Sequence, residues 1–296
     1  MPHAYLESNW CGFAWTEWAP FENAANAFRA LPILPGIYRV QAMSTGELAY
    51  IGQTGRPLRE RLGALRLNTL KPDMPWNDPH TAAPALWSYR DARQESFACS
   101  VAPVDLSTAN RCALECYVLW RYRAERGSST LCNFGRLFPG YRKSRNRSTG
   151  DRGGRVSESG PVTASASLPA LVGESDHRAV AWMGLPWSVD LPLSTTALAD
   201  VQNTPGVYRL IDRRSGELLY IGESSDLRGR LQTHTASDWD SHLVACSYCL
   251  LPMALKKAQR LEVENDLIGA YFHQQQASPI FQFQRHLALT SPAPSG

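Results

Sequence analysis

The sequence predicts two copies of one small domain, each combining a β-hairpin with helices. Two short runs rich in β-branched and aromatic residues, 36–40 and 48–52, flank a glycine-containing turn, which is the pattern of a hairpin. The same pattern returns at 206–210 and 218–222, with a constant offset of 170 residues. A repeat of this length indicates a duplicated domain, and 296 residues are enough for two cores of ordinary size.

The hairpins place two tyrosines near each other in each copy. Residues that face each other across a regular hairpin have position numbers with a constant sum, and 36 with 52 gives the same sum as 38 with 50. Tyr38 is therefore expected to face Tyr50, and Tyr208 to face Tyr220. A single such pair is compatible with ordinary aromatic packing, but this stretch occurs twice in the chain.

A helix is expected after each hairpin, and each carries an arginine at the same place. In the first copy, a leucine stripe begins just after Pro57, and Arg61 lies beside that stripe. In the second copy, Asp226 can cap the helix and Arg230 matches Arg61. Such an arginine is either a solvated charge or a phosphate clamp with two parallel hydrogen bonds, and the adjacent hairpin favours the clamp.

A later helix in each copy carries a glutamate inside an apolar stripe. Glu264 has Leu261, Leu267 and Ile268 at helical spacing, and Glu115 stands in a similar stripe. Burial of an unpaired carboxylate costs free energy, so each glutamate is expected to have a cation or a hydrogen-bond donor as partner. A metal ion and a structural arginine are both compatible with this pattern.

The tripeptides Gly36-Ile37-Tyr38 and Tyr50-Ile51-Gly52, with a Gly206-Val207-Tyr208 variant in the second copy, resemble those that name the GIY-YIG nuclease superfamily. The resemblance implies an α+β domain, with a small three-stranded antiparallel sheet flanked by helices, that hydrolyses a DNA phosphodiester using one Mg²⁺ or Mn²⁺ ion. By the same resemblance, a tyrosine orients or deprotonates the attacking water, the arginine stabilises phosphate charge, and the glutamate holds the metal. The implied catalytic residues are Tyr38, Tyr50, Arg61, Glu115 and Asn133 in the first copy, and Tyr208, Tyr220, Arg230, His234, Glu264 and Gln282 in the second; Glu115 and Glu264 are the metal ligands.

The copies differ at several of these places. Gln282 stands where the family has an asparagine, matched by Asn133 in the first copy. His234 follows Arg230 by four residues, as in restriction-type family members where a histidine assists the tyrosine, whereas the first copy has a leucine there. His80 can replace it only if the inserted loop at about 65–87 folds back.

The second copy also has an acid, Glu223, directly after its YIG tripeptide, where the first copy has neutral Gln53. This carboxylate is expected to repel phosphate, which makes the second copy the better candidate for a site reduced to a binding role.

A basic stretch separates the copies. Residues 135–156 hold six arginines and a lysine against one acid, interleaved with Gly, Ser and Asn, and are expected to form a flexible arm without a core. The arm is either a DNA backbone contact or a solubilising linker. The predicted domains are 1–135 and 182–296, with the arm and linker at 136–181. The candidate DNA contacts are Arg59, His80, Arg136, Arg142, Lys143, Arg145, Arg147, Arg152, Arg155 and Arg228.

The sequence therefore predicts a metal-dependent endodeoxyribonuclease with two tandem sites, each cutting one strand. The competing hypothesis is a DNA-binding protein in which one or both domains are catalytically silent. No nucleotide cofactor and no membrane partner are expected, and a monomer suffices because both sites share one chain. The start lacks a basic region followed by an apolar run, which favours a cytoplasmic location. Seven scattered cysteines imply no disulfide framework. Sequence specificity, biological role and the identity of the base among the tyrosines stay open.

Overall fold

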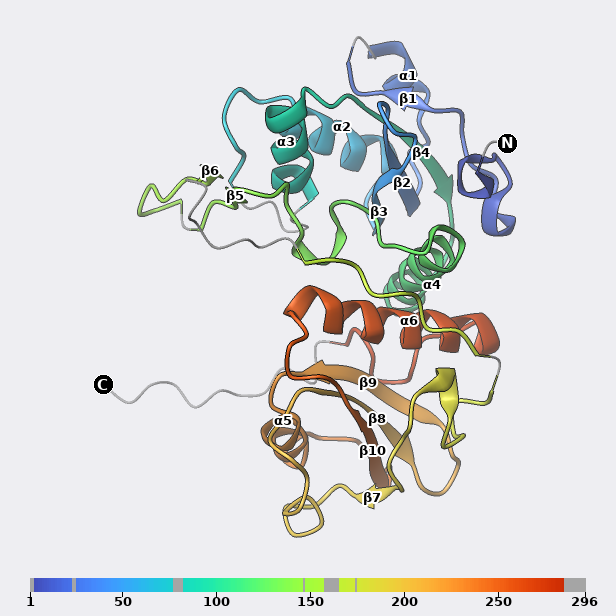
Figure 1. Ribbon diagram of the computed structural model, residues 1–296. Helices are drawn as coiled ribbons and strands as arrows, with labels where there is room; N and C mark the ends of the chain where they lie inside the picture. The colour runs from blue at the N-terminus through green and yellow to red at the C-terminus, as the bar shows by residue number, and fades with distance from the viewer. Residues whose placement is uncertain are drawn as a thin grey trace. The chain divides into compact units, whose positions relative to one another are not determined.

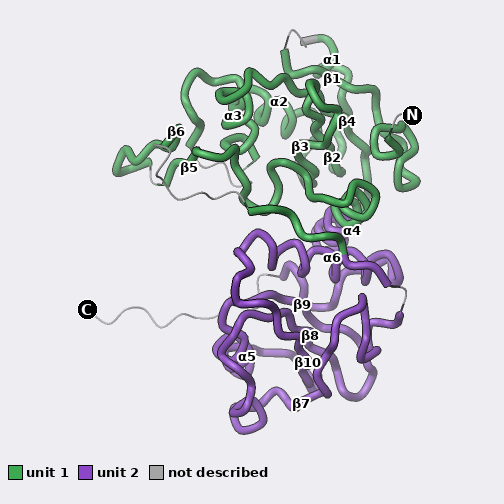
Figure 2. The backbone as a smooth tube through the Cα atoms, in the orientation of Figure 1, with its two compact units in different colours: residues 1–107, 118–170 green, residues 108–117, 171–296 purple. Residues whose placement is uncertain are grey.

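The computed structural model describes residues 3–22, 25–76, 82–145, 147–156, 165–173 and 175–284 (Figure 1). The chain divides into two compact units, one of residues 1–107 with 118–170 and the other of 108–117 with 171–296 (Figure 2). These limits differ from the expected boundaries at 135 and 181, because part of a long helix groups with the second unit and the basic segment groups with the first.

Each unit is built on one four-stranded antiparallel sheet. The first has the order β1-β4-β2-β3, made of β1 (Ala19–Pro20), β2 (Gly36–Ala42), β3 (Leu48–Thr54) and β4 (Phe97–Pro103). The second has the order β7-β10-β8-β9, made of β7 (Leu191–Pro192), β8 (Gly206–Asp212), β9 (Leu218–Ser224) and β10 (Val244–Leu250). Antiparallel sheets combined with helices confirm the α+β class. The implied three strands are present in each sheet, with a two-residue edge strand added as the fourth.

A helix follows each hairpin and another follows the next strand, as expected, and two further helices in the first unit were not predicted. The first unit has α1 (Ala25–Ala30), α2 (Leu58–Thr69) and α3 (Ala82–Arg93), the second has α5 (Leu227–His234) and α6 (Lys257–Gln275), and α4 (Thr108–Arg126) has residues in both units. Short 3₁₀ helices occupy Ala4–Leu6, Trp10–Gly12, Asn133–Gly135 and Trp182–Gly184. Within the described residues, no helix has both the length and the apolar character needed to cross a membrane.

The inserted loop is more regular than expected. Helix α2 continues to Thr69, and α3 occupies the end of the range 65–87 that was expected to be an inserted loop. Pro84 is the third residue of α3, where a missing backbone N–H breaks no intrahelical hydrogen bond, so it is compatible with the first turn of this helix. His80 falls in 77–81, outside the described residues.

The predicted register of the hairpins is wrong by two residues. Tyr38 pairs with Gly52, and Val40 pairs with Tyr50. Paired positions sum to 90 from Gly36 to Val40 and to 89 at Gln41, beyond a bulge, so the sum of 88 on which the prediction relied occurs on neither side of the bulge. The second sheet has the same register and the same bulge. The two tyrosines of each copy thus lie diagonally on one face of the sheet rather than directly opposite each other.

This register explains the glycine that ends each YIG tripeptide. A Cβ atom on Gly52 would lie 2.5 Å from Cζ and from the hydroxyl of Tyr38. A Cβ on Gly222 would overlap the hydroxyl of Tyr208 in the same way. The tyrosine ring therefore lies across its partner strand only because the facing residue has no side chain.

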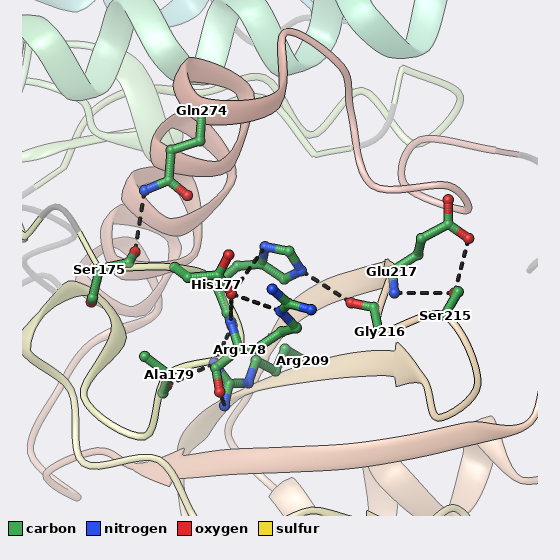
Figure 3. Close-up of polar contacts among 10 residues, drawn as sticks. Ser175, His177, Arg178, Ala179, Arg209, Ser215, Gly216, Glu217 and Gln274 are labelled. Atoms are coloured by element: carbon green, nitrogen blue, oxygen red, sulfur yellow. Dashed lines mark hydrogen bonds and ion pairs between the residues drawn. The ribbon is translucent and has the colours of Figure 1, made fainter.

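The opposite face of each sheet is closed by a buried arginine. Arg39 donates through Nη1 to the carbonyl of Tyr5 at 2.5 Å, and its guanidinium lies 4.4 Å from the ring centroid of Trp15. In the second unit, Arg209 donates to the carbonyls of His177 and Ala179, as Figure 3 shows. Burial lowers the pKa of Arg39 to about 9 and that of Arg209 to about 10, so both stay charged at neutral pH. The aromatic segments that precede the two hairpins (the lead-in segments) thus cover the back of each sheet.

The basic segment is not a flexible arm. Tyr141 and Leu137 are buried in a cluster with Met74 and Trp87, and Tyr141–Arg142 (β5) pairs with Gly154–Arg155 (β6). The expectation that this stretch has no core is therefore wrong, because its few apolar residues pack against α3. No disulfide joins any of the seven cysteines, all of which lie among the described residues.

The facing glycines give the first testable prediction. Gly52→Ala and Gly222→Ala are each expected to lower the free energy of unfolding by about 1–3 kcal/mol, because the added methyl overlaps a tyrosine ring. Gly63→Ala in α2 is the control: a methyl group there would have no atom within 4 Å, and the change should stabilise by about 0.5–1 kcal/mol. Urea unfolding measures all three variants. Equal stability of the Gly222 variant and the wild type would contradict this steric account.

Candidate functional site

The second unit gathers four of the predicted residues around one phenol. Tyr208 on β8 and Tyr220 on β9 stack with ring centroids 6.1 Å apart. The Tyr208 hydroxyl lies 3.1 Å from Nε of Arg230 and 2.8 Å from Nε2 of His234. Asp226 caps α5 by accepting from the backbone N–H of Gly229 at 2.9 Å, as predicted, and this fixes the start of the helix that supplies both contacts.

Burial sets the charge state of these groups. It raises the pKa of Tyr208 above its ordinary value, an effect that the charge of Tyr220 increases and that of Arg230 opposes. Burial, and then the charge of Arg230, lowers the pKa of His234 to about 3, so the imidazole is neutral at neutral pH. A neutral imidazole can accept a proton through Nε2, and Arg230 donates to the phenol oxygen from which that proton would come.

The first unit repeats the tyrosine–arginine contact. Nε and Nη2 of Arg61 lie 3.3 and 3.2 Å from the Tyr38 hydroxyl. The Tyr38 and Tyr50 rings stack with centroids 6.1 Å apart, the same separation as in the second unit. Leu65 takes the position that corresponds to His234, and it is fully buried in the core. The two sites therefore share the arginine geometry and differ in the group beside the phenol.

The predicted metal ligand of the second unit lies beside another carboxylate. Glu264, half-buried on α6, accepts a hydrogen bond through Oε1 from the backbone N–H of Glu223 at 3.2 Å. Burial raises the pKa of Glu264 to about 8, and the neighbouring Glu223 charge acts in the same direction. A bound cation would favour the ionised form of Glu264 and lower this pKa, so the side chain would be a carboxylate at neutral pH.

An arginine that the sequence reasoning missed neutralises Glu223. Nε of Arg260 lies 2.7 Å from Oε2 of Glu223, and both side chains are nearly buried. The expectation that Glu223 repels phosphate overlooked this ion pair. The sequence did offer a signal for this arginine. Arg260 precedes Glu264 by four residues, so the two side chains lie on the same face of α6.

A divalent ion fits this arrangement in part. Among the residues that the structure describes, no three His, Cys, Asp or Glu side chains gather in a way that could hold a metal. Mg²⁺ commonly uses one or two carboxylates and takes its other ligands from water and phosphate, which suits Glu264 with Glu223 beside it. Glu115 is half-buried on α4, in the stretch 108–117 that belongs to the second unit.

The predicted amides hold the sheet in each unit. Asn133 accepts from the backbone N–H of Ile51 at 3.0 Å and donates to its carbonyl at 2.8 Å. Gln282 makes the same pair of bonds to Ile221, at 2.9 and 3.1 Å. The longer amide of Gln282 therefore reproduces the asparagine contacts, and both residues fix the middle of a YIG tripeptide.

The predicted DNA contacts fall into two groups. Arg59 and Arg228 donate through Nε to the carbonyls of Leu31 and Val201, at 2.9 and 2.6 Å. Those bonds hold the loop that precedes each GIY tripeptide. Among the basic-segment residues, Arg136 is buried and Arg142 half-buried, whereas the following are exposed: Lys143, Arg145, Arg147, Arg152 and Arg155.

The buried histidine predicts a pH effect on stability. His234 stays neutral in the folded protein down to about pH 3, whereas an unfolded histidine takes up a proton near its ordinary pKa of 6.5. The unfolded state then binds more protons between these values, so stability falls as the pH drops through this window. His234→Leu, which copies Leu65, should remove this loss. Between pH 7 and pH 5 the wild type should lose about 2 kcal/mol more than this variant.

Urea unfolding at the two pH values measures the difference. His273→Gln, at an exposed position on α6, is the matched control and should keep the pH dependence of the wild type. Identical pH dependence in His234→Leu and the wild type would mean that His234 is not buried neutral.

Comparison with protein families gives one match, to the GIY-YIG catalytic domain, over residues 204–247. The matched stretch contains Tyr208, Tyr220, Arg230 and His234, and it ends before Glu264. No curated protein matches the chain, and no solved structure does. The match supports the superfamily for one of the two copies, and GIY-YIG domains are generally nucleases that act on DNA.

Proposed function

We propose that the chain is a divalent-metal-dependent DNA endonuclease with one site at each hairpin. The observation that carries this proposal is the Tyr208 hydroxyl, held between the Arg230 guanidinium and a neutral His234. A phenol with an ordinary pKa near 10 is a poor base at neutral pH. Activity therefore needs a group that takes its proton and a charge that stabilises the phenolate, and both groups touch this oxygen.

In the second unit, the tyrosine pair receives a proton from the attacking water. Tyr220 is half-buried, whereas Tyr208 is fully buried, so we assign the first contact with water to Tyr220. As Tyr220 takes the proton of the water, its own phenolic proton passes to the hydroxyl of Tyr208, and the proton of Tyr208 passes in turn to Nε2 of His234. A phosphate bound at Arg230 would offset the guanidinium charge that helps to lower the pKa of His234, which makes this transfer easier when substrate is present.

The carboxylates supply the remaining chemistry. Glu264, with Glu223 beside it, would hold Mg²⁺ or Mn²⁺, which when bound neutralises charge on the phosphate and the leaving oxygen. Arg260 offsets the charge of Glu223, so phosphate can approach the second site. The shared tyrosine–arginine contact supports a second, weaker site at Tyr38 and Arg61, and one chain with two sites can cut both strands as a monomer.

Removal of the metal-binding carboxylate tests the chemistry. Glu264→Gln keeps the shape but loses the charge, and should slow cutting of its strand about a hundredfold or more with Mg²⁺ present. Folding should persist, because an uncharged amide is less costly to bury than a carboxylate. Glu60→Gln, at an exposed position in α2, is the control. Strand-resolved cleavage at the wild-type rate by the Glu264 variant would exclude the metal assignment.

Loss of each arginine tests the two-site proposal. Arg61→Ala and Arg230→Ala are each expected to leave a nickase, with opposite strand preference. The nick left in Arg230→Ala should be the slower one, since Leu65 cannot accept a proton where His234 can. Cleavage of a duplex labelled on either strand measures both effects. If Arg61→Ala cuts both strands as the wild type does, the first unit is catalytically silent and only the second unit is a nuclease.

A further inference from the structure

The basic segment of the first unit is a short hairpin, and the end at which β5 and β6 pair is called its root. Strands β5 and β6 pair through Tyr141 with Arg155 and Arg142 with Gly154. The backbone N–H of Val156 donates to the carbonyl of Gly140 at 2.8 Å, which closes the base of the hairpin. Figure 1 shows this hairpin as a projection beside α3.

Buried side chains attach the root to the rest of the unit. The Tyr141 ring packs against Trp87 with centroids 6.2 Å apart, and its hydroxyl donates to Asp91 at 2.7 Å. Ser144 is fully buried, donates to the carbonyl of Pro75 at 3.2 Å and accepts from the N–H of Gly153 at 2.9 Å. The hairpin is therefore held in one orientation rather than free on a linker.

Backbone hydrogen bonds also join the described residues near the tip. The N–H of Arg145 donates to the carbonyl of Asp151 at 3.0 Å, and that of Arg152 donates to Gly150 at 2.8 Å. The N–H of Gly150 donates to the carbonyl of Arg147 at 3.3 Å. A turn ordered before binding loses less conformational entropy when a ligand docks.

The positive charges of the hairpin divide by role. Arg142 pairs with Asp151 at 2.7 Å, and Asp151 is the one acid in residues 136–156. Arg152 pairs with Asp73 at 3.0 Å and lies 5.1 Å from the ring centroid of Trp76. Arg142 and Arg152 therefore already have carboxylate partners within the protein. The remaining cations are exposed, and the hairpin has no second acid to compensate them: Lys143, Arg145, Arg147 and Arg155.

We propose that this hairpin docks on the phosphate backbone of duplex DNA. Four like charges on one short, rigid turn repel one another in the free protein, and phosphates relieve that repulsion while releasing counterions. A linker that only aids solubility needs neither the buried Tyr141 and Ser144 nor an ordered tip. The identity of the partner rests on the proposed nuclease function, and the hairpin then serves as a sequence-independent grip on its substrate.

Binding of a labelled duplex in the presence of chelator tests this without any need for cleavage. The test variant is K143Q/R145Q/R147Q/R155Q. The matched control, R29Q/K71Q/R213Q/R214Q, removes the same charge from exposed positions elsewhere. The hairpin variant should bind about tenfold or more weakly at low salt, and the slope of log K against log salt should fall by about 0.9 for each phosphate that it no longer neutralises. The control should bind within about threefold of the wild type.

A third variant, Ser144→Ala, keeps every charge but loosens the root. It should weaken binding several-fold, and melting curves of all variants should show that the unit stays folded. Equal binding by the hairpin variant and the control, or tighter binding of the wild type to single-stranded RNA than to the duplex, would overturn the proposal. Unchanged binding by Ser144→Ala would overturn the inference that DNA binding needs the hairpin to be held at its base. A wild type that binds duplex through the hairpin yet never cuts would instead refute the nuclease function alone.

Discussion

The close approach of a tyrosine ring to a strand that lacks a side chain is the constraint on which both sites depend. Tyr38 and Tyr208 lie across Gly52 and Gly222, where any Cβ atom would collide with the phenol. This places each hydroxyl within reach of the helix that follows the hairpin, where an arginine meets it. The glycine of each YIG tripeptide therefore has a steric role, because it allows a phenol to be held at a fixed height above the sheet.

Strands β2 and β8 each carry a buried tyrosine on one face of the sheet and a buried arginine on the other. Tyr208 points to the site, whereas its neighbour Arg209 points to the opposite face and binds carbonyls of the lead-in segment. Because side chains alternate along a strand, a shift of one residue would exchange the two faces. The arginine on the back, satisfied by carbonyl acceptors, therefore stabilises the same register that positions the tyrosine on the front. Asn133 and Gln282 add to this by fixing the backbone of the neighbouring strand.

Local patterns in the sequence predicted most of the residues that lie around Tyr208, and long-range packing explains what they missed. The repeat, the tyrosines, Arg230 and the Asp226 cap follow from spacing along the chain, and the resemblance to the nuclease superfamily added His234. The register did not follow from spacing, because the two tripeptides are not aligned end to end across the hairpin, and nothing in their composition shows this offset. The ion pair of Arg260 with Glu223 joins residues on a helix and a strand, 37 positions apart. The basic segment has a composition typical of disorder, yet Tyr141 finds Trp87 far away in sequence, and such a partner is invisible to a window of neighbouring residues.

The two units keep one scaffold but place different chemistry around it. Both have the phenol, the arginine and the amide that fixes the sheet. Beside the phenol, the residue changes from the aliphatic Leu65 to the imidazole of His234, and each is buried in its own unit. A leucine there brings no titration penalty, whereas a buried histidine costs stability as the pH falls. The stability cost of His234 in the second unit is expected if this residue serves proton transfer. Leu65 is expected in the first unit if holding the substrate matters more there than the rate of cutting.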